Sequence, residues 1–172
     1  MTALWTAFPP TGRAALLGVV ASAAVAIALG IFIPLEVRRH VLTAEARGLE
    51  AAVVALTPSL PDFRSGSLSP AQVAAADGVV DRALLNAEYV RAKLWSLDGT
   101  VIYSDEHDLI GLNFESVATK ITEVTTSDRL QFEVTDLDEA ENEFERSYRE
   151  LVEFYVPVRD EAGRIVAVLE IY

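Results

Sequence analysis

The sequence contains no cysteine and only two histidines, which excludes several kinds of site at the outset. Without cysteine the chain has no disulfide framework, no thiolate nucleophile and no zinc–thiolate site. Basic residues are also scarce, because 14 Lys and Arg stand against 26 Asp and Glu, giving a formal net charge of -12. Surfaces that bind nucleic acid carry clustered Lys and Arg, so nucleic acid is not an expected partner.

Charge is also missing from one long stretch near the N-terminus. From Ala14 to Leu35 no residue is charged, and only Ser22 carries a polar side chain. A helix of this length crosses the roughly 30 Å hydrocarbon core of a bilayer. We therefore predict a short tail over 1–13 and a transmembrane helix over 14–35.

Two other interpretations of this stretch fit less well. A cleaved export signal has a shorter apolar run that ends in a small-x-small cleavage site, whereas this run leads into charged residues after Pro34. A small soluble domain rarely encloses a helix that is apolar on every face. An uncleaved membrane anchor is the interpretation we adopt.

The distribution of arginine bears on which side of the membrane the domain occupies. Arg13 precedes the apolar stretch, whereas Arg38, Arg39 and Arg47 follow it. By the positive-inside rule alone this favours a cytoplasmic domain, but long domains can translocate regardless of charge. Charge therefore leaves the orientation open, and the family resemblance described below favours the extracytoplasmic side.

A juxtamembrane helix is predicted over 36–56. A heptad-like stripe of apolar residues follows one side of it: Leu42, Ala46, Leu49, Val53 and Leu56. The stripe can pack on the domain's own sheet, or it can pair with a second copy of the chain and carry a signal to the membrane. The sequence leaves both interpretations open.

The remaining domain, 57–172, begins with a loop and a helix. Two prolines, a glycine and four serines in 57–69 indicate a surface connection. Ser69 is a suitable N-cap, and Pro70 suits the first helical position, so we predict a helix from there to about Ala87.

Alternating apolar and polar residues then predict a sheet. The expected strands are 89–97, 100–104, 130–135, 151–159 and 164–172. Asp98-Gly99 predicts a two-residue hairpin with a type I′ turn, and 114–124 a short helix. Pro157 cannot donate to a strand ladder, so its strand should lie at an edge or carry a bulge. The predicted fold class is α+β, with a five-stranded antiparallel sheet and leading helices.

Three parts of the sequence resemble a known family. They are LWSLDGTVIYSD over 94–105, LIGLNF over 109–114, and EFYVPVRD with GRIVAVLEIY at the end of the chain. Together they resemble the PAS-like, Cache-type sensor domains of bacterial membrane receptors, such as sensor histidine kinases, diguanylate cyclases and chemoreceptors. The resemblance covers about 36–172, and it informs the fold more than the ligand because the matching positions are turn and core positions.

The resemblance also implies where a ligand would bind. A PAS-like pocket lies between the sheet and the segment that follows the first hairpin. Tyr103, Phe132 and Tyr155 are the aromatic candidates, and Arg146 is suited to an anionic group. Each of them can instead be a core or surface residue.

Other polar clusters are interpreted as solvated. His107 lies among Asp105, Glu106 and Asp108, but a structural metal site usually draws two or more spaced His or Cys ligands. The acidic run from Asp136 to Glu145 lacks the glycine that a calcium-binding loop requires. No nucleophile elbow or catalytic triad is recognisable. We therefore expect no metal, no cofactor and no catalytic residues in this segment.

The resemblance implies the sensory input region of a bacterial membrane-bound signal-transduction receptor. Its sensor domain would lie on the extracytoplasmic side of the cytoplasmic membrane, bind a small molecule and form a homodimer. Such receptors continue into a second span and a transmitter, so we expect a fragment or a truncated product ending at Tyr172. The alternative is a membrane-anchored PAS-like adaptor that binds another protein and has no signalling output.

Overall fold

The computed structural model describes residues 10–64, 66–85, 89–135, 137–148 and 150–172. Contacts divide the chain into two units, Met1–Glu45 and Ala46–Tyr172. One helix, α1 (Pro10–Leu56), contributes residues to both and continues through Pro34. The two helices expected over 14–35 and 36–56 are therefore one, because a single proline removes one hydrogen bond without ending a long helix.

The first unit contains the apolar part of α1. An 18-residue window of this helix has a mean hydropathy of 2.3, and 0% of the window is buried within the described chain. Large apolar side chains such as Val25 and Phe32 are 58% and 63% exposed. By length and composition this helix can cross a membrane.

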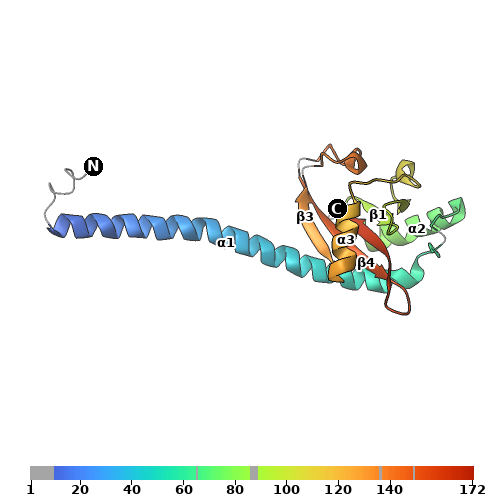
Figure 1. Ribbon diagram of the computed structural model, residues 1–172, viewed down its shortest axis with the longest axis horizontal. Coiled ribbons are helices and arrows are strands. Elements are labelled where there is room, and N and C mark those ends of the chain that lie inside the picture. Colours follow the sequence, from blue (N-terminus) through green and yellow to red (C-terminus); the bar gives the residue numbers. More distant parts are fainter. Residues whose placement is uncertain (1–9, 65, 86–88, 136, 149) are drawn as a thin grey trace. The chain divides into compact units, whose positions relative to one another are not determined.

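The second unit is built on a five-stranded antiparallel sheet in the order β2-β1-β5-β4-β3 (Figure 1). The strands are β1 (Ala92–Trp95), β2 (Val101–Ser104), β3 (Gln131–Thr135), β4 (Leu151–Arg159) and β5 (Ile165–Ile171). In addition to the end of α1, this unit contains the helices α2 (Pro70–Ala83) and α3 (Ala118–Ser127). This is the predicted α+β class, with a PAS-like arrangement.

The hairpin at Asp98-Gly99 is confirmed, but its turn type is not the expected one. Gly99 has a φ of 84°, whereas Asp98 has no positive φ. The Gly99 amide donates to the Ser96 carbonyl at 3.1 Å, and the Ser96 amide donates to the Thr100 carbonyl at 2.8 Å. The bond between Gly99 and Ser96 makes Leu97 and Asp98 the central residues of the turn, and neither has a positive φ. The turn is therefore type I, followed by Gly99 in the left-handed conformation, whereas a type I′ turn requires a positive φ at both Asp98 and Gly99.

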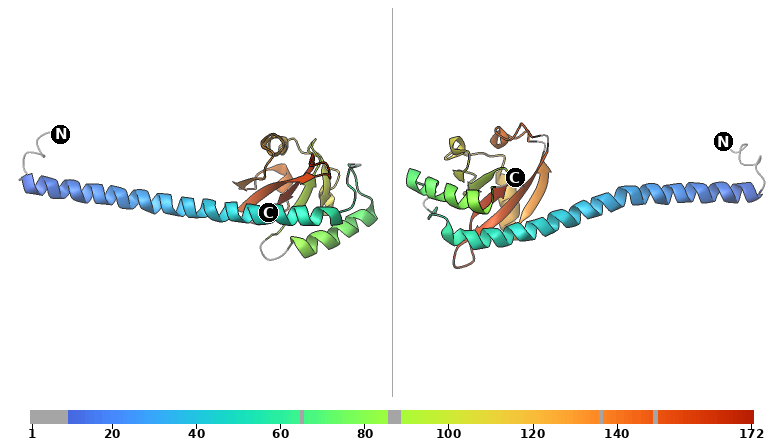
Figure 2. Two further views of the ribbon diagram at one scale, coloured as in Figure 1. Left: turned by 90° about the horizontal axis from the view of Figure 1, so that it is seen from below. Right: turned by 180° about the vertical axis from the view of Figure 1, so that it is seen from behind.

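One face of the sheet packs against α1 and α2. Ala46, Leu49, Val53 and Leu56 are at most 7% exposed, so most of the heptad-like stripe packs within the chain's own domain. Leu56 shares a small apolar cavity with Val80 of α2 and with residues of β1 and β5. Ser69 caps α2 with a capping box to Gln72, as its sequence position predicted. Figure 2 shows the second unit from two further sides.

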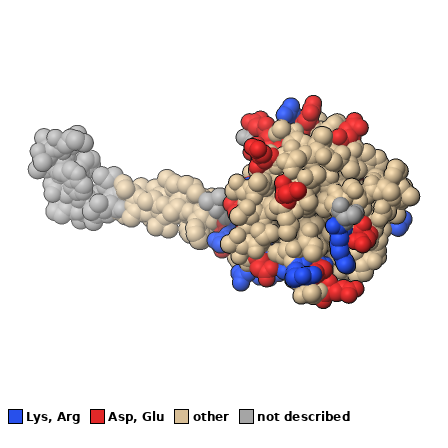
Figure 3. Space-filling view, turned by 45° about the vertical axis from the view of Figure 1, so that its right-hand side comes forward, with Lys and Arg blue, Asp and Glu red and all other residues tan. Residues whose placement is uncertain are grey.

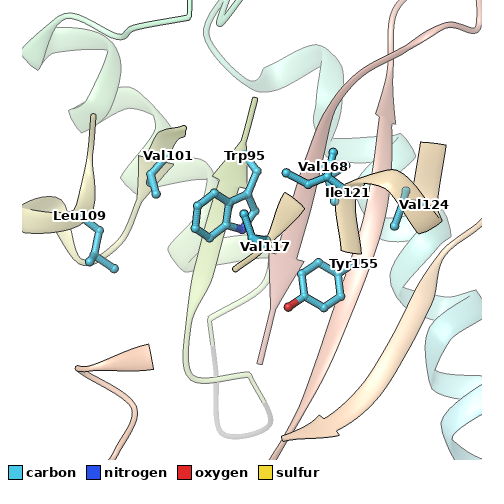
Figure 4. Packing of buried hydrophobic residues seen from close by; sticks show 8 residues of the cluster. All are labelled: Trp95, Val101, Leu109, Val117, Ile121, Val124, Tyr155 and Val168. Carbon is cyan, nitrogen blue, oxygen red and sulfur yellow. The ribbon is translucent and has the colours of Figure 1, made fainter. Parts of the chain in front are cut away.

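The opposite face carries an apolar cluster beneath α3. Trp95 and Val168 of the sheet share this cluster with Ile121 and Val124 of α3, and Figure 4 shows its side chains. The Trp95 ring meets Phe114 edge-on, with 5.9 Å between the ring centroids. This cluster occupies one part of the face, and buried polar residues such as Lys93 and Glu170 occupy another part.

One strand prediction changes in detail, and the prediction for Pro157 is confirmed. The strand expected over 130–135 is β3, but it lies at the sheet edge with Val134 41% exposed, so apolar alternation does not produce burial there. Pro157 lies on β4, which has neighbours on both sides. However, β3 begins at Gln131 opposite Tyr155 and runs from there toward Leu151, so the Pro157 stretch pairs only with β5 and is a local edge. A register shift follows after Val158.

Candidate functional site

Polar side chains interrupt the apolar strands at matching positions. In the sheet register Ser104 pairs with Lys93, Lys93 with Glu170, and Glu170 with Tyr155. Paired residues of antiparallel strands point to the same face, so these side chains form a row across four strands. Lys93, Ser104 and Glu170 are 0% exposed. The row lies on the face that also carries the apolar cluster beneath α3.

Residues 137–148 supply further polar groups to this row, and we call them the covering segment. Their only regular element is a three-residue turn, η4 (Ala140–Asn142). Glu141, Asn142 and Glu145 of this segment are 3%, 1% and 1% exposed. With the strands they form the polar cluster, which comprises Arg91, Lys93, Glu141, Asn142, Glu145, Glu153, Tyr155, Glu170 and Tyr172.

The Lys93 ammonium is surrounded by oxygen atoms. Its Nζ lies 2.6 Å from the Glu141 carbonyl, 3.2 Å from the Tyr172 hydroxyl, and 3.3 Å from both Asn142 Oδ1 and Glu145 Oε2. It also lies 4.7 Å from the centroid of the Tyr172 ring. These oxygen atoms give the ammonium group hydrogen-bond acceptors, and the Tyr172 ring adds a cation–π contact.

Arg91 links the covering segment to the first hairpin. Its Nε donates to Glu145 Oε1, and its Nη1 donates to Asp105 Oδ2 at 2.8 Å. The other Asp105 oxygen accepts from the Ala92 amide at 2.8 Å. The Arg91 side chain is 14% exposed, so the guanidinium lies at the rim of the polar cluster.

Glu153 and Glu170 flank the Tyr155 hydroxyl. Tyr155 donates to Glu153 Oε2 at 2.8 Å, and Asn142 Nδ2 donates to Glu153 Oε1 at 3.1 Å. Burial, followed by the charge of Glu170, raises the pKa of Glu153 to about 7. Burial also raises the pKa of Glu170, against the opposing effect of Lys93.

The cluster holds more acidic than basic groups. Four carboxyl groups are at most 3% exposed, those of Glu141, Glu145, Glu153 and Glu170, whereas Lys93 is the fully buried cation among the described residues. Trp95 Nε1 donates to Glu170 Oε2 at 2.9 Å. Glu170 Oε1 has no hydrogen-bond partner among the residues described. A buried carboxylate oxygen without a partner is costly, so this atom can accept a further donor.

The four ligand candidates named from the sequence are not brought together. Tyr155 lies in the polar cluster. Tyr103 pairs with Leu94 on the face that packs against α2, and its hydroxyl donates to Asp77 at 2.9 Å. Phe132 pairs with Phe154, with the ring centroids 5.9 Å apart. Arg146 is exposed on the covering segment.

The acidic run was interpreted as a solvated face, and this is wrong for two of its residues. Asp138, Glu139 and Glu143 are exposed, but Glu141 and Glu145 are buried. They turn inward because Ser116 donates to the Glu141 carboxylate at 2.7 Å, and because Arg91 and Lys93 both bond Glu145. Asp136 lies outside the described residues. Acidic groups on the face shown in Figure 3 are spread over several places.

His107 makes a local contact. Its Nε2 lies 3.0 Å from Asp77 Oδ1, and this hydrogen bond raises the pKa of the imidazole. Within the described ranges no group of three or more His, Cys, Asp and Glu is arranged to hold a metal ion.

Sequence reasoning missed most of the polar cluster. The available signal was a single charged residue inside an apolar run, as with Lys93 before Leu94-Trp95 and Glu170 between Leu169 and Ile171. Charged residues are rarely fully buried unless they are paired. The pairing itself depends on the register of strands distant in the chain.

Comparison with known proteins gives matches among solved structures alone. No protein-family model and no curated protein sequence matches the chain. A sensory box sensor histidine kinase from Vibrio cholerae shares 16% identity, with 57% of this chain and 90% of that chain covered and a TM-score of 0.40. An extracellular ligand binding receptor from Desulfohalobium retbaense DSM5692 shares 13% identity, with 76% of this chain and 24% of that chain covered and a TM-score of 0.40. The chain thus spans about a quarter of the length of that receptor.

Proposed function

We propose that this chain is the sensory input region of a bacterial membrane-bound signal-transduction receptor. It binds a small extracytoplasmic molecule at the polar cluster and passes the signal along α1 through the cytoplasmic membrane. The observation that carries the proposal is the polar cluster, in which charged groups are buried beneath a segment with little regular structure.

Stability alone is a poor reason for such a cluster. Buried ion pairs are often no more stabilising than apolar residues of similar volume, because removing charges from water is costly. Groups with strongly perturbed pKa values tend to gather at functional sites. Glu153 and Glu170 both have raised pKa values, and they lie side by side around Tyr155.

The path from the site to the membrane is α1. Leu49 and Val53 bury one part of this helix in the domain, and the apolar window lies in the same continuous helix. A ligand that binds one arrangement of the cluster better than another shifts the population of both. We further propose that the receptor is a homodimer, in which Val37 and Val41 on the exposed side of α1 face the second copy.

The absence of cysteine makes this proposal directly testable. A Val41→Cys variant of the full chain in lipid nanodiscs takes a single spin label, and dipolar spectroscopy then measures the distance between two protomers. We expect a resolved distance that changes when Glu145→Ala disturbs the covering segment, and that stays constant with the exposed control Glu161→Gln. An absent dipolar signal refutes the dimer, and a distance unaffected by Glu145→Ala refutes the coupling.

Sidedness needs a separate measurement. Glu161 lies on the exposed turn between β4 and β5, so a Glu161→Cys variant is accessible from the side on which the domain resides. We expect a membrane-impermeant maleimide to label this variant in spheroplasts with an intact cytoplasmic membrane. Labelling only after lysis would place the domain in the cytoplasm and overturn the extracytoplasmic assignment.

A further inference from the structure

The polar cluster already displays one way of holding an ammonium group. Lys93 Nζ is bound by a backbone carbonyl, an amide oxygen, a carboxylate and a tyrosine hydroxyl, with the ring of Tyr172 beside it. Its distance to Glu170 Oε2 is 3.9 Å. These oxygen atoms and this aromatic face are the groups that recognise primary ammonium ions.

Lys93 leaves part of this acceptor capacity unused. Glu170 is 0% exposed, and its Oε1 has no hydrogen-bond partner in the described part of the chain. Glu153 accepts one hydrogen bond at each oxygen, from Asn142 and Tyr155, and neither donor carries a charge. Lys93 is the cation that faces Glu170, 3.9 Å from its Oε2, and it is shared with Glu145, so these carboxyl groups outnumber the cations beside them.

We propose that the polar cluster binds a small primary ammonium compound, with its positive charge beside Glu170 and Glu153 and an N–H group donating to Glu170 Oε1. The inference rests on the proposed function, because it names the ligand class of the same site. An ammonium ion meets two requirements together, a compensating charge and a hydrogen-bond donor.

Entry of the ligand requires movement of the covering segment. This segment is joined to the strands through Glu141, Asn142 and Glu145, and those contacts converge on Lys93 and Arg91. At its start, Leu137 has a φ of 66° while its side chain is 1% exposed. A bulky residue in this conformation is strained, so opening the segment releases some unfavourable energy.

Ammonium binding is coupled to protonation. The charged and titratable groups that face Glu153 and Glu170 are Lys93, Glu133, Glu141, Glu145, Tyr155 and Tyr172. Arg91 and Asp105 lie at the rim. Because the pKa of Glu153 is about 7, this carboxyl group is partly protonated near neutral pH, which removes part of the negative charge of the polar cluster. An ammonium ion displaces that proton, so binding becomes tighter as pH rises toward 8.

The test uses the full chain in nanodiscs with methylammonium chloride as the probe. Tetramethylammonium chloride is the matched cation without an N–H donor, and sodium chloride controls for ionic strength. We expect methylammonium alone to raise Tm, with a larger shift at pH 8 than at pH 6. Calorimetry in buffers of different ionisation enthalpy should detect proton release on binding.

A conservative variant identifies the position. Glu170→Gln keeps an acceptor for Trp95 but removes the carboxylate charge, and we expect methylammonium to bind roughly ten- to a hundredfold more weakly. Glu161→Gln, the same change on an exposed turn, should leave binding unchanged. Equal affinity in Glu170→Gln, or equal Tm shifts with tetramethylammonium or sodium, overturns the proposal.

Two outcomes separate this inference from the proposed function. A Tm that responds to pH but not to methylammonium makes the proton the ligand of the cluster and overturns the ammonium assignment. If the distance between the spin labels at Val41→Cys in the two protomers still changes with Glu145→Ala, the proposed sensory function is retained although the ligand class is wrong. If methylammonium binds and the distance stays constant, the ammonium site stands and the signalling role is refuted.

Discussion

The face of the sheet opposite α1 and α2 is divided between two kinds of interior. Beneath α3, Trp95 and Val168 pack against apolar side chains. Two residues away on the same strands, Lys93 and Glu170 lie in the polar cluster. Both parts exclude solvent, since all four residues are 0% exposed.

The apolar cluster and the polar cluster differ in the interactions that stabilise their buried atoms. The apolar cluster is stabilised by hydrophobic burial and close packing, which do not depend on protonation. The polar cluster depends on each charge having a partner. Tyr155 belongs to both, since its ring joins the apolar cluster and its hydroxyl donates to Glu153. A fold needs the first kind of interior, whereas the second makes stability respond to the surroundings.

Removing the buried cation should have the largest effect. In Lys93→Met, Glu145 and Glu170 lose the positive charge that faces them, and we expect the free energy of unfolding to fall by roughly 3–5 kcal/mol at pH 8. The loss should be smaller at pH 5, where carboxyl groups take up protons. Urea unfolding followed by the fluorescence of buried Trp95 measures both values.

The control for that variant is Lys120→Met. Lys120 pairs with Glu133, and both side chains are partly exposed, so the expected loss is only about 0–1 kcal/mol. An equal loss for Lys93→Met at both pH values would show that the polar cluster behaves like the apolar one.

Truncation beneath α3 provides the opposite case. Ile121 is 3% exposed, and Ile121→Ala should lower the free energy of unfolding by roughly 2–5 kcal/mol through lost burial and the cavity left behind. We expect the same loss at pH 5 and pH 8. Thr122→Ala on the exposed side of α3 is the control, and a pH-dependent loss for Ile121→Ala would mean that the two clusters are not separate.

Glu153 tests the pH dependence itself. Its folded pKa of about 7 lies above the ordinary value of 4.5, so the folded state binds more protons between these values. Stability should therefore fall as pH rises through this window. Glu153→Gln should flatten the slope and raise the free energy of unfolding above pH 7 by roughly 2–3 kcal/mol. An unchanged slope in urea titrations between pH 4 and 8 would contradict the assignment.

The smallest effect should come from His107. Its bond to Asp77 raises the pKa of the imidazole, so the stability from this pair is present below pH 6.5 and is lost as pH rises through the folded pKa. The imidazole is 55% exposed, and His107→Gln should cost about 0–1 kcal/mol at pH 6. The same urea titrations check it, and an altered slope near pH 5 would point to another group.

Local chemistry made much of the fold predictable. Ser69 and Pro70 located the start of α2, and β4 was predicted from Leu151 to Arg159. The type I turn at Asp98 was not predictable from the dipeptide, because an Asp-Gly pair suits both a two-residue type I′ loop and a type I turn that is followed by a left-handed glycine. The ranges 14–35 and 36–56 were separated because charged residues begin at Glu36, whereas the backbone of α1 continues through both ranges.

The site was less predictable because its parts are distant in the chain. Lys93 and Glu145 become partners only when the covering segment returns over β1. An acidic run usually indicates a solvated surface, and nothing within 136–145 distinguishes Glu145 from Glu143 without the sheet register. Tyr155 was named as a candidate from its aromatic character, whereas the structure gives its hydroxyl two acidic neighbours.

Pro34 also has a mechanical consequence for α1. Its ring nitrogen cannot donate to the carbonyl of Gly30, so the helix lacks one hydrogen bond at this level. A helix bends most easily where a backbone hydrogen bond is missing, whereas the fully hydrogen-bonded turns on either side resist bending. A tilt of α1 is therefore absorbed mainly near Pro34, while a displacement along the helix axis is transmitted through it.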